Sequence, residues 1–272
     1  MALTMSDEAL VREIQRTIQD YVFAWEGERE QLLDCGETLV RAIAVPWYGV
    51  DGIATSFNFD PATVDSRLDE ILEEAEGGGK RFLWMIGPGA RPTNLGEKFA
   101  ARGYVVAAEW DGMVLDDLSE ELVGNPEVVI ESVTEENAAD FAMLGAFGYE
   151  DNPAVYEERL AAAHRYARIP DKQVLIYLAR LGQDVTGYVT MRIEPTGAAY
   201  FRNALTLPEY REHGVYLSLS AHRLKVAREA GCTYAVVQAN RQTSGPILRK
   251  RGFRPMCGFT GYARPDPTSK GW

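Results

Sequence analysis

The stretch TLPEYREHGVY, from Thr206 to Tyr216, decides the fold that this 272-residue sequence predicts. It follows an apolar segment with the pattern of a strand, at 198–207, and opens an amphipathic segment with the spacing of a helix, at 214–230. A glycine-containing turn at a helix start leaves backbone N–H groups pointing outward, beside the positive end of the helix dipole. Both features suit a pyrophosphate, so we expect a phosphate-binding loop at Arg211–Tyr216.

The strand before this loop is expected to lose its partner on one side. Pro208 has no backbone N–H to donate to a neighbouring strand, so pairing should end there. A strand splayed in this way leaves backbone groups free for an extended amide ligand. Pantetheine, which contains two amides, fits that description.

The pattern beyond residue 126 predicts a mixed α/β fold. Strand-like segments are expected at 128–133, 173–180, 185–194, 198–207, 233–238 and 253–263, and helices at 135–148, 154–168, 214–230 and 243–251. This order requires both antiparallel and parallel strands in the sheet.

The first part of the chain predicts a second domain. We expect helices at 8–25, after Asp60–Pro61 and at 94–102, two strands within 38–59, and further strands at 81–87 and 104–115. The acidic segment DDLSEELVGNP, at 116–126, has little pattern and is taken as the boundary. The expected domains are therefore 1–118 and 126–272.

A faint internal repeat links the two halves. The pattern of AEGGGKRFLWMIGP and LGEKFAARGYVVAAEWDG matches that of REAGCTYAVVQAN and GPILRKRGFRPMCGFTG, which come later in the chain. Arg102–Gly103–Tyr104 corresponds to Arg251–Gly252–Phe253. A glycine between a helix and a strand is also a common way to end a helix, so that plainer explanation stays open.

The run TLPEYREHGVYLSLSAHRLKVAREAG resembles the phosphate-loop motif of the GNAT acetyltransferase superfamily, Arg/Gln-x-x-Gly-x-Gly/Ala, with Arg211 and Gly214 at its first two fixed positions. The later run QANRQTSGPILRKRGF resembles the next motif of that family. There, Asn240 takes the place of the polar residue that often contacts CoA, and Ser244 follows it.

The resemblance implies a fold and an activity. The fold is the mixed-sheet acyl-CoA N-acyltransferase (GNAT) fold, in tandem with a degenerate GNAT-like N-terminal half. The activity is N-acyl transfer from acetyl-CoA or another acyl-CoA, as cosubstrate, to a small-molecule or protein amine, with backbone groups near Leu205–Leu207 holding the thioester. The residues expected to bind the cosubstrate are Leu205, Thr206, Leu207, Arg211, Glu212, His213, Gly214, Val215, Tyr216, Asn240 and Ser244.

The sequence departs from the family pattern at three positions. Tyr216 stands where the family has Gly or Ala, and Leu217 where many members carry a hydroxyl. Leu248 occupies the place of a tyrosine that serves as general acid, and leucine has no proton to donate. Tyr262 is a candidate replacement. The departures leave three alternatives open: an acyl-CoA binder or sensor, hydrolysis or decarboxylation of an acyl thioester, and a purely structural protein.

The N-terminal half has no phosphate loop of its own. Its corresponding helix is expected to begin at Asp60–Pro61, and a carboxylate there satisfies the amides that would bind a phosphate. This half is therefore expected to shape the substrate site or the structure. Glu150 and Asp151, where the first helix of the other half ends, are candidates to orient an amine.

The composition limits the expected partners. A net charge of -12 disfavours nucleic acid and anionic lipid. The three cysteines lack metal-ligand spacing, and no apolar run has the length of a membrane span. With no signal-peptide pattern at the start, a cytoplasmic protein without a metal is expected. Homodimerisation stays open.

Overall fold

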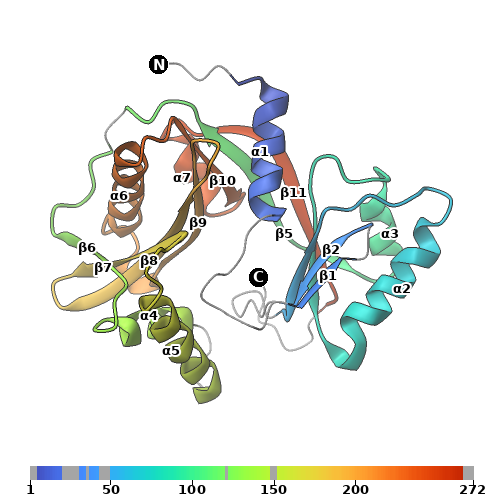
Figure 1. Cartoon of the computed structure of the whole chain (residues 1–272), viewed down its shortest axis with the longest axis horizontal. Coiled ribbons are helices and arrows are strands. Elements are labelled where there is room, and N and C mark those ends of the chain that lie inside the picture. The colour runs from blue at the N-terminus through green and yellow to red at the C-terminus, as the bar shows by residue number, and fades with distance from the viewer. Residues whose placement is uncertain are drawn as a thin grey trace.

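A single mixed sheet runs through both halves of the chain (Figure 1). The computed structural model describes residues 5–19, 31–34, 37–42, 50–119, 122–147 and 152–265. Within these residues the sheet has 11 strands in the order β1-β2-β3-β4-β11-β5-β10-β9-β8-β7-β6. Parallel and antiparallel pairs both occur, which confirms the predicted α/β class.

The elements of the first half follow the predicted order. They are α1 (Asp7–Gln19), β1 (Gln31–Asp34), β2 (Leu39–Ala42), β3 (Gly52–Thr55), α2 (Val64–Glu76), the 3-10 turn η3 (Gly77–Gly79), β4 (Phe82–Ile86), α3 (Leu95–Ala101) and β5 (Val105–Leu115). Strand β1 was not expected, and residues 20–25 of the first predicted helix lie outside the described residues. Asp60 does not begin α2: its Oδ1 accepts from the Ala62 N–H at 2.8 Å in the turn before the helix.

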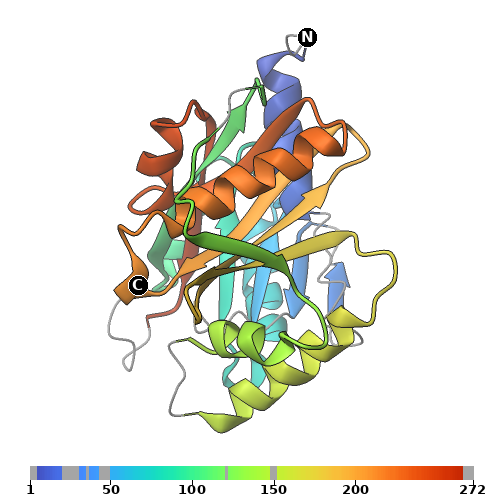
Figure 2. The same ribbon diagram turned by 90° about the vertical axis from the view of Figure 1, so that its left-hand side faces the viewer.

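The second half also keeps its predicted order. Its elements are β6 (Val128–Ser132), α4 (Ala138–Gly145), α5 (Pro153–Ala167), β7 (Val174–Leu181), β8 (Asp184–Ile193), β9 (Ala198–Thr206), the 3-10 turn η4 (Pro208–Tyr210), α6 (Val215–Glu229), β10 (Tyr234–Asn240), α7 (Ser244–Arg249) and β11 (Arg254–Ala263). In Figure 2, α6 crosses one face of the sheet while α4 and α5 lie below it.

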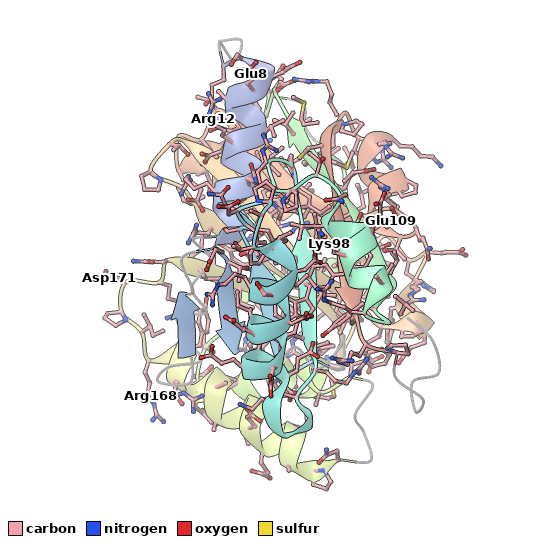
Figure 3. All side chains as sticks on the ribbon, turned by 90° about the vertical axis from the view of Figure 1, so that its right-hand side faces the viewer. Glu8, Arg12, Lys98, Glu109, Arg168 and Asp171 are labelled. Atoms are coloured by element: carbon pink, nitrogen blue, oxygen red, sulfur yellow. The ribbon has the colours of Figure 1, made fainter. Side chains whose placement is uncertain are left out.

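The helices bury three apolar clusters against the sheet. One cluster joins α1, α4 and α5 to the sheet and includes Ile14 and Phe141. A second lies under α6 and α7 and includes Leu219. The third lies under α2 and α3 in the N-terminal half, where Lys98 of α3 also pairs with Asp65 of α2 at 2.7 Å (Figure 3).

The two halves exchange their last strands. β5 ends the N-terminal half but lies between β10 and β11, whereas β11 ends the C-terminal half but lies between β4 and β5. Each of these strands therefore pairs with elements that come from the other half of the sequence. The expected limits of the domains, 1–118 and 126–272, stay a prediction, but the sheet itself is shared across them.

The register of β5 and β11 supports the internal repeat. The repeat equates Val105 with Arg254 and Val114 with Ala263, and these four residues form two cross-strand pairs, Arg254 with Val114 and Ala263 with Val105. When each residue of one pair is replaced by its equivalent in the repeat, the other pair results. The two register shifts are equivalent in the same way. One leaves Met256 of β11 without a cross-strand partner, and the other leaves the equivalent residue of β5 without one.

The Arg-Gly-aromatic signature of the repeat ends α3 and α7 in the same way. Gly103 and Gly252 have φ values of 81° and 84°, which suit glycine at a helix end. The next aromatic residue then donates its N–H back to the helix, from Tyr104 to Phe99 O and from Phe253 to Leu248 O, each at 3.1 Å. Both helices therefore end at a glycine in the common way, and the matching geometry of the two ends is also what the repeat predicts.

Candidate functional site

The site is built on two parallel strands that separate. β9 and β10 pair at four positions, the last being Phe201 with Val237. β9 then continues to Thr206, paired on its other edge with β8 as far as Gly187. The predicted splay is confirmed, but it begins at Arg202, well before Pro208. Between these points, the β9 edge that faces β10 has no strand partner among the residues that the structure describes.

A bulge bends β9 within this unpaired stretch. The register between β8 and β9 shifts at Val189 and Thr190, and Asn203 has a positive φ of 23°. Farther along, the two backbones approach so closely that a Cβ at Gly187 would overlap the carbonyl oxygen of Leu205. The glycine therefore lets β8 hold the last residues of β9 while the opposite edge stays open.

The loop after β9 presents backbone amides. Leu207 donates its N–H to Thr186 O at 2.9 Å, the turn η4 follows, and positive φ values of 67° at Glu212 and 78° at Gly214 lead into α6. The Ser218 N–H bonds to Gly214 O at 2.9 Å. Within the described part of the chain, the N–H groups of residues 212–217 have no protein acceptor. Arg211, Glu212 and His213 are exposed, whereas Val215 is buried.

Asn125 holds this loop from behind, although no sequence motif marked it as a site residue. Its Nδ2 donates to His213 O at 2.9 Å, and its backbone N–H donates to Ser218 Oγ at 2.8 Å. A Cβ on Gly214 would come 3.0 Å from the Asn125 Cβ, so the two residues are in close contact. The segment before β6 thus holds both the turn and the first turn of α6.

Tyr216 and Arg223 extend the site along α6. The phenol of Tyr216 is a hydrogen-bonding partner of the Arg223 guanidinium, so it turns along the helix toward the sheet. Burial lowers the pKa of Arg223 from its ordinary value, and the neighbouring phenol offsets part of that effect. Arg223 was not predicted as a site residue, because an arginine in an amphipathic helix usually faces solvent.

Residues of the second predicted motif make structural contacts, and the expected CoA contacts of Asn240 and Ser244 stay a prediction. Asn240 Oδ1 accepts from the Gln242 and Thr243 N–H groups at 2.9 and 3.2 Å, which caps the turn before α7. Ser244 is half-buried at the start of that helix. Leu248 is 2% exposed and packs in the cluster under α6 and α7. Leu217 is half-buried beside the loop.

The structure does not bring Tyr262 to the loop, which corrects the expectation of a replacement acid. Its ring stacks on Phe99 at 5.6 Å between centroids, in the cluster under α2 and α3. The reason is the strand exchange, since β11 pairs Tyr262 with Trp84 of the N-terminal half. Glu150 and Asp151 lie outside the described residues.

An ion-pair cluster around the buried carboxylate of Asp111 lies beside the end of β10. Arg241 donates from Nε to Asp111 Oδ1 at 2.8 Å and from Nη1 to Glu109 at 2.7 Å, and Arg249 binds the other oxygen of Asp111. Both carboxylates come from β5. Arg249 of α7 is therefore tied to β5, which leaves less positive charge free for a ligand.

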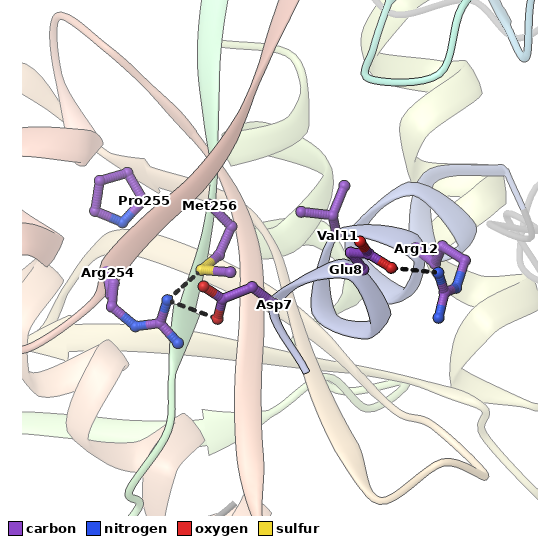
Figure 4. A pocket seen from close by; sticks show the side chains of 7 residues that line it. All are labelled: Asp7, Glu8, Val11, Arg12, Arg254, Pro255 and Met256. Carbon is purple, nitrogen blue, oxygen red and sulfur yellow. Dashed lines mark hydrogen bonds and ion pairs between the residues drawn. The ribbon is translucent and has the colours of Figure 1, made fainter. Parts of the chain in front are cut away.

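An open pocket of about 400 Å³ lies elsewhere, where α1 begins beside the start of β11 (Figure 4). Its charged side chains pair with one another or with their neighbours: Arg254 with Asp7 at 3.4 Å and Asp116 at 3.0 Å, and Arg12 with Glu8 at 4.0 Å. The pocket is not part of the loop at α6.

In the described residues, no helix has the length and apolarity to cross a membrane, and no group of three or more His, Cys, Asp or Glu side chains could hold a metal.

The mixed sheet, with β9 splayed from β10 before the start of α6, defines a mixed α/β fold of the GNAT type. Residues 131–253 match the acetyltransferase (GNAT) family. A GCN5-related N-acetyltransferase from Kribbella flavida is similar over 94% of this chain and 96% of its own, with a TM-score of 0.63 and 16% identity.

Two further structures share this architecture. A GCN5-related N-acetyltransferase from Sphaerobacter thermophilus is similar over 100% of this chain and 98% of its own, with a TM-score of 0.59 and 16% identity. A tandem GNAT protein from the clavulanic acid biosynthesis pathway covers 78% of this chain and 74% of its own, with a TM-score of 0.52 and 13% identity. At these identities the likeness concerns the fold. No curated protein matches the chain.

Proposed function

We propose that the protein transfers an acyl group from acyl-CoA to the nitrogen of a small-molecule or protein amine. The observation that carries this proposal is the separation of β9 from β10 after Phe201, followed by a loop of free amides at the start of α6. An open strand edge suits the amides of pantetheine, and free N–H groups at a helix start suit a pyrophosphate. The open edge of β9 leads directly into the loop, just as pantetheine is joined directly to the pyrophosphate in CoA.

Acyl-CoA supplies a thioester whose C–S bond breaks as the amine nitrogen forms the new C–N bond, leaving the CoA thiol. The chain's own contribution is binding and orientation. The N–H groups of residues 212–217 bind the diphosphate, and the open edge of β9 aligns the thioester for attack. A β9 N–H directed at the thioester carbonyl stabilises the charge that develops on its oxygen. Leu248 is a buried hydrocarbon side chain, so it supplies no proton to the leaving thiolate.

Calorimetric titration with acetyl-CoA tests the binding site. Arg211→Ala removes a cation beside the phosphates, and Gly214→Glu places a carboxylate on the turn in a conformation that favours glycine. We expect each variant to weaken binding by about ten-fold or more. The melting temperature should stay close to that of the wild type in Arg211→Ala and fall in Gly214→Glu, because a side chain at this positive φ is strained. Arg251→Ala, which removes an exposed arginine outside the loop, is the matched control and should bind normally.

Turnover then separates the alternatives. Consumption of acetyl-CoA that requires an added amine, followed across a panel of small amines and lysine peptides, supports transfer. Release of free thiol without an amine would indicate hydrolysis or decarboxylation, and tight binding without turnover would indicate a sensor. If the wild-type protein bound no CoA at all, the proposed site would be rejected.

A further inference from the structure

Arg223 is a buried cation in the middle of the proposed site. It lies on the face of α6 that packs on the sheet and is 2% exposed. Its guanidinium carbon lies 4.3 Å from the centroid of the Phe201 ring. Its Nη1 donates to the carbonyl oxygen of Arg202 at 3.3 Å. Phe201 is the last β9 residue paired with β10 and Arg202 is the next, so the guanidinium lies where the two strands part.

The charge of Arg223 has no carboxylate partner among the described residues. Elsewhere in the protein, buried carboxylates are paired: Glu194 with Arg16 at 2.9 Å, and Asp111 with Arg241 at 2.8 Å. Arg223 has a carbonyl, a distant hydroxyl of Ser220 at 3.5 Å, and a phenol. Burying an unpaired charge costs several kcal/mol, so a persistent buried cation usually has an anion to meet.

One edge of the guanidinium is left for such an anion. Nη1 is held by Arg202, whereas Nε is buried with no hydrogen-bond partner in the described structure. Nη2, which lies on the same side of the group as Nε, makes a long contact to Ser220 at 3.5 Å. The Nε and Nη2 donors form the fork that binds a carboxylate through two parallel hydrogen bonds.

We propose that Arg223 selects an acyl group that ends in a carboxylate, as in the thioesters of short dicarboxylic acids. This inference rests on the proposed function, which aligns the thioester along the open edge of β9. The acyl end then lies at the narrow end of the gap, beside the Arg202 carbonyl and the fork of Arg223. Tyr216, which stands where the family has a small residue, is part of this arrangement because its phenol holds the guanidinium.

The test compares ligands that differ in the acyl group alone. The wild-type protein is titrated calorimetrically with CoA, acetyl-CoA, malonyl-CoA and succinyl-CoA. We expect malonyl-CoA or succinyl-CoA to bind at least about ten-fold more tightly than acetyl-CoA, because one ligand carboxylate meets a buried guanidinium. Equal affinity for all the thioesters would overturn the selection while leaving CoA binding, and so the proposed function, intact. A protein that bound none of them would lose both.

Variants assign the preference to this residue. Arg223→Met keeps an unbranched apolar stem but removes the guanidinium and its charge, and should bring acetyl-CoA and the dicarboxylic thioesters to the same affinity. Arg223→Lys should keep part of the preference. Lys225→Met removes a charge from the exposed side of the same helix and should leave it unchanged. If Arg223→Met melts early or fails to fold, the wild-type comparison and Arg223→Lys still decide. A preference unchanged in folded Arg223→Met would overturn the assignment.

Discussion

Trp110 of β5 and Phe259 of β11 face each other as cross-strand partners, and the internal repeat equates these same two positions. Their pair is therefore the centre about which the two exchanged strands are related. On either side, equivalent residues pair in exchanged order out to the ends of both strands. Two similar halves thus meet through a self-complementary pair of strands, in the way that two subunits meet across a two-fold axis.

The strand exchange predicts that neither half folds alone. A fragment of residues 1–125 would lack β11, which covers β4, and a fragment of 126–272 would lack β5, which covers β10. Exposed strand edges of this kind promote aggregation. We expect no cooperative thermal transition by circular dichroism for either fragment, and recovery of the transition when both are co-expressed. A cooperative transition in one isolated fragment would contradict the prediction.

The close contact of β8 and β9 predicts a specific sensitivity at Gly187. A methyl group there would overlap Leu205 O, which belongs to the backbone and cannot turn aside. Gly187→Ala should lower the free energy of unfolding by roughly 1–3 kcal/mol in urea denaturation. Gly77→Ala is the control, since its new Cβ would have no atom within 4 Å and its φ of -53° is open to alanine. Equal losses in both variants would argue against the overlap.

The hydrogen bonds of Asn125 predict an effect on the loop. Asn125→Ala removes the donor to His213 O and the acceptor for the Glu127 N–H. We expect a loss of about 1 kcal/mol in stability and weaker acetyl-CoA binding. Asn137→Ala removes a similar pair of local bonds, to Thr134 N and Ser132 O, away from the loop. It should cost similar stability and leave acetyl-CoA affinity unchanged; an equal loss of affinity would show that Asn125 has no special role.

Glu13 predicts part of the acid sensitivity. Burial pushes its pKa upward, but hydrogen bonds from Arg16 and Thr196, with the charges of Arg16 and Arg192, hold the net pKa below the ordinary 4.5. Because the folded-state pKa is the lower one, its stabilisation is complete above about pH 4.5 and is lost as the pH falls through the folded value.

Glu13→Gln should therefore flatten the fall in stability between about pH 5 and pH 3, measured by urea denaturation across that range. Glu8→Gln, at a side chain of the same helix that is 89% exposed, is the control and should keep the wild-type slope. The same slope in Glu13→Gln would show that other carboxylates dominate.

The sequence predicted the fold where the pattern is local. Apolar periodicity located the helices and most strands, and the Arg-Gly-aromatic signature marked the repeat. β1, with the short sequence QLLD, has too few residues for a pattern to be recognised. The strand exchange was not predicted because pairing between β5 and β11 joins residues far apart in the sequence.

The candidate site also has features that follow from local sequence signals and features that depend on tertiary packing. The splay was predicted from Pro208, a local signal, although its starting point depends on β10. The assignment of a phosphate to Arg211–Tyr216 stays a prediction. The positions of Tyr262 and Arg223 are set by tertiary packing: one faces α2 and α3 through the exchanged strand, and the other turns inward from a helix whose charged residues normally meet water.

The placement of β11 also affects when the N-terminal half can fold during translation. β4 emerges early in synthesis, but the strand that covers its edge is completed only at Ala263. The edge of β4 therefore stays unprotected until the residues up to Ala263 have been translated. Nascent protein of this kind depends on chaperones, or on fast closure once the last strand leaves the exit tunnel.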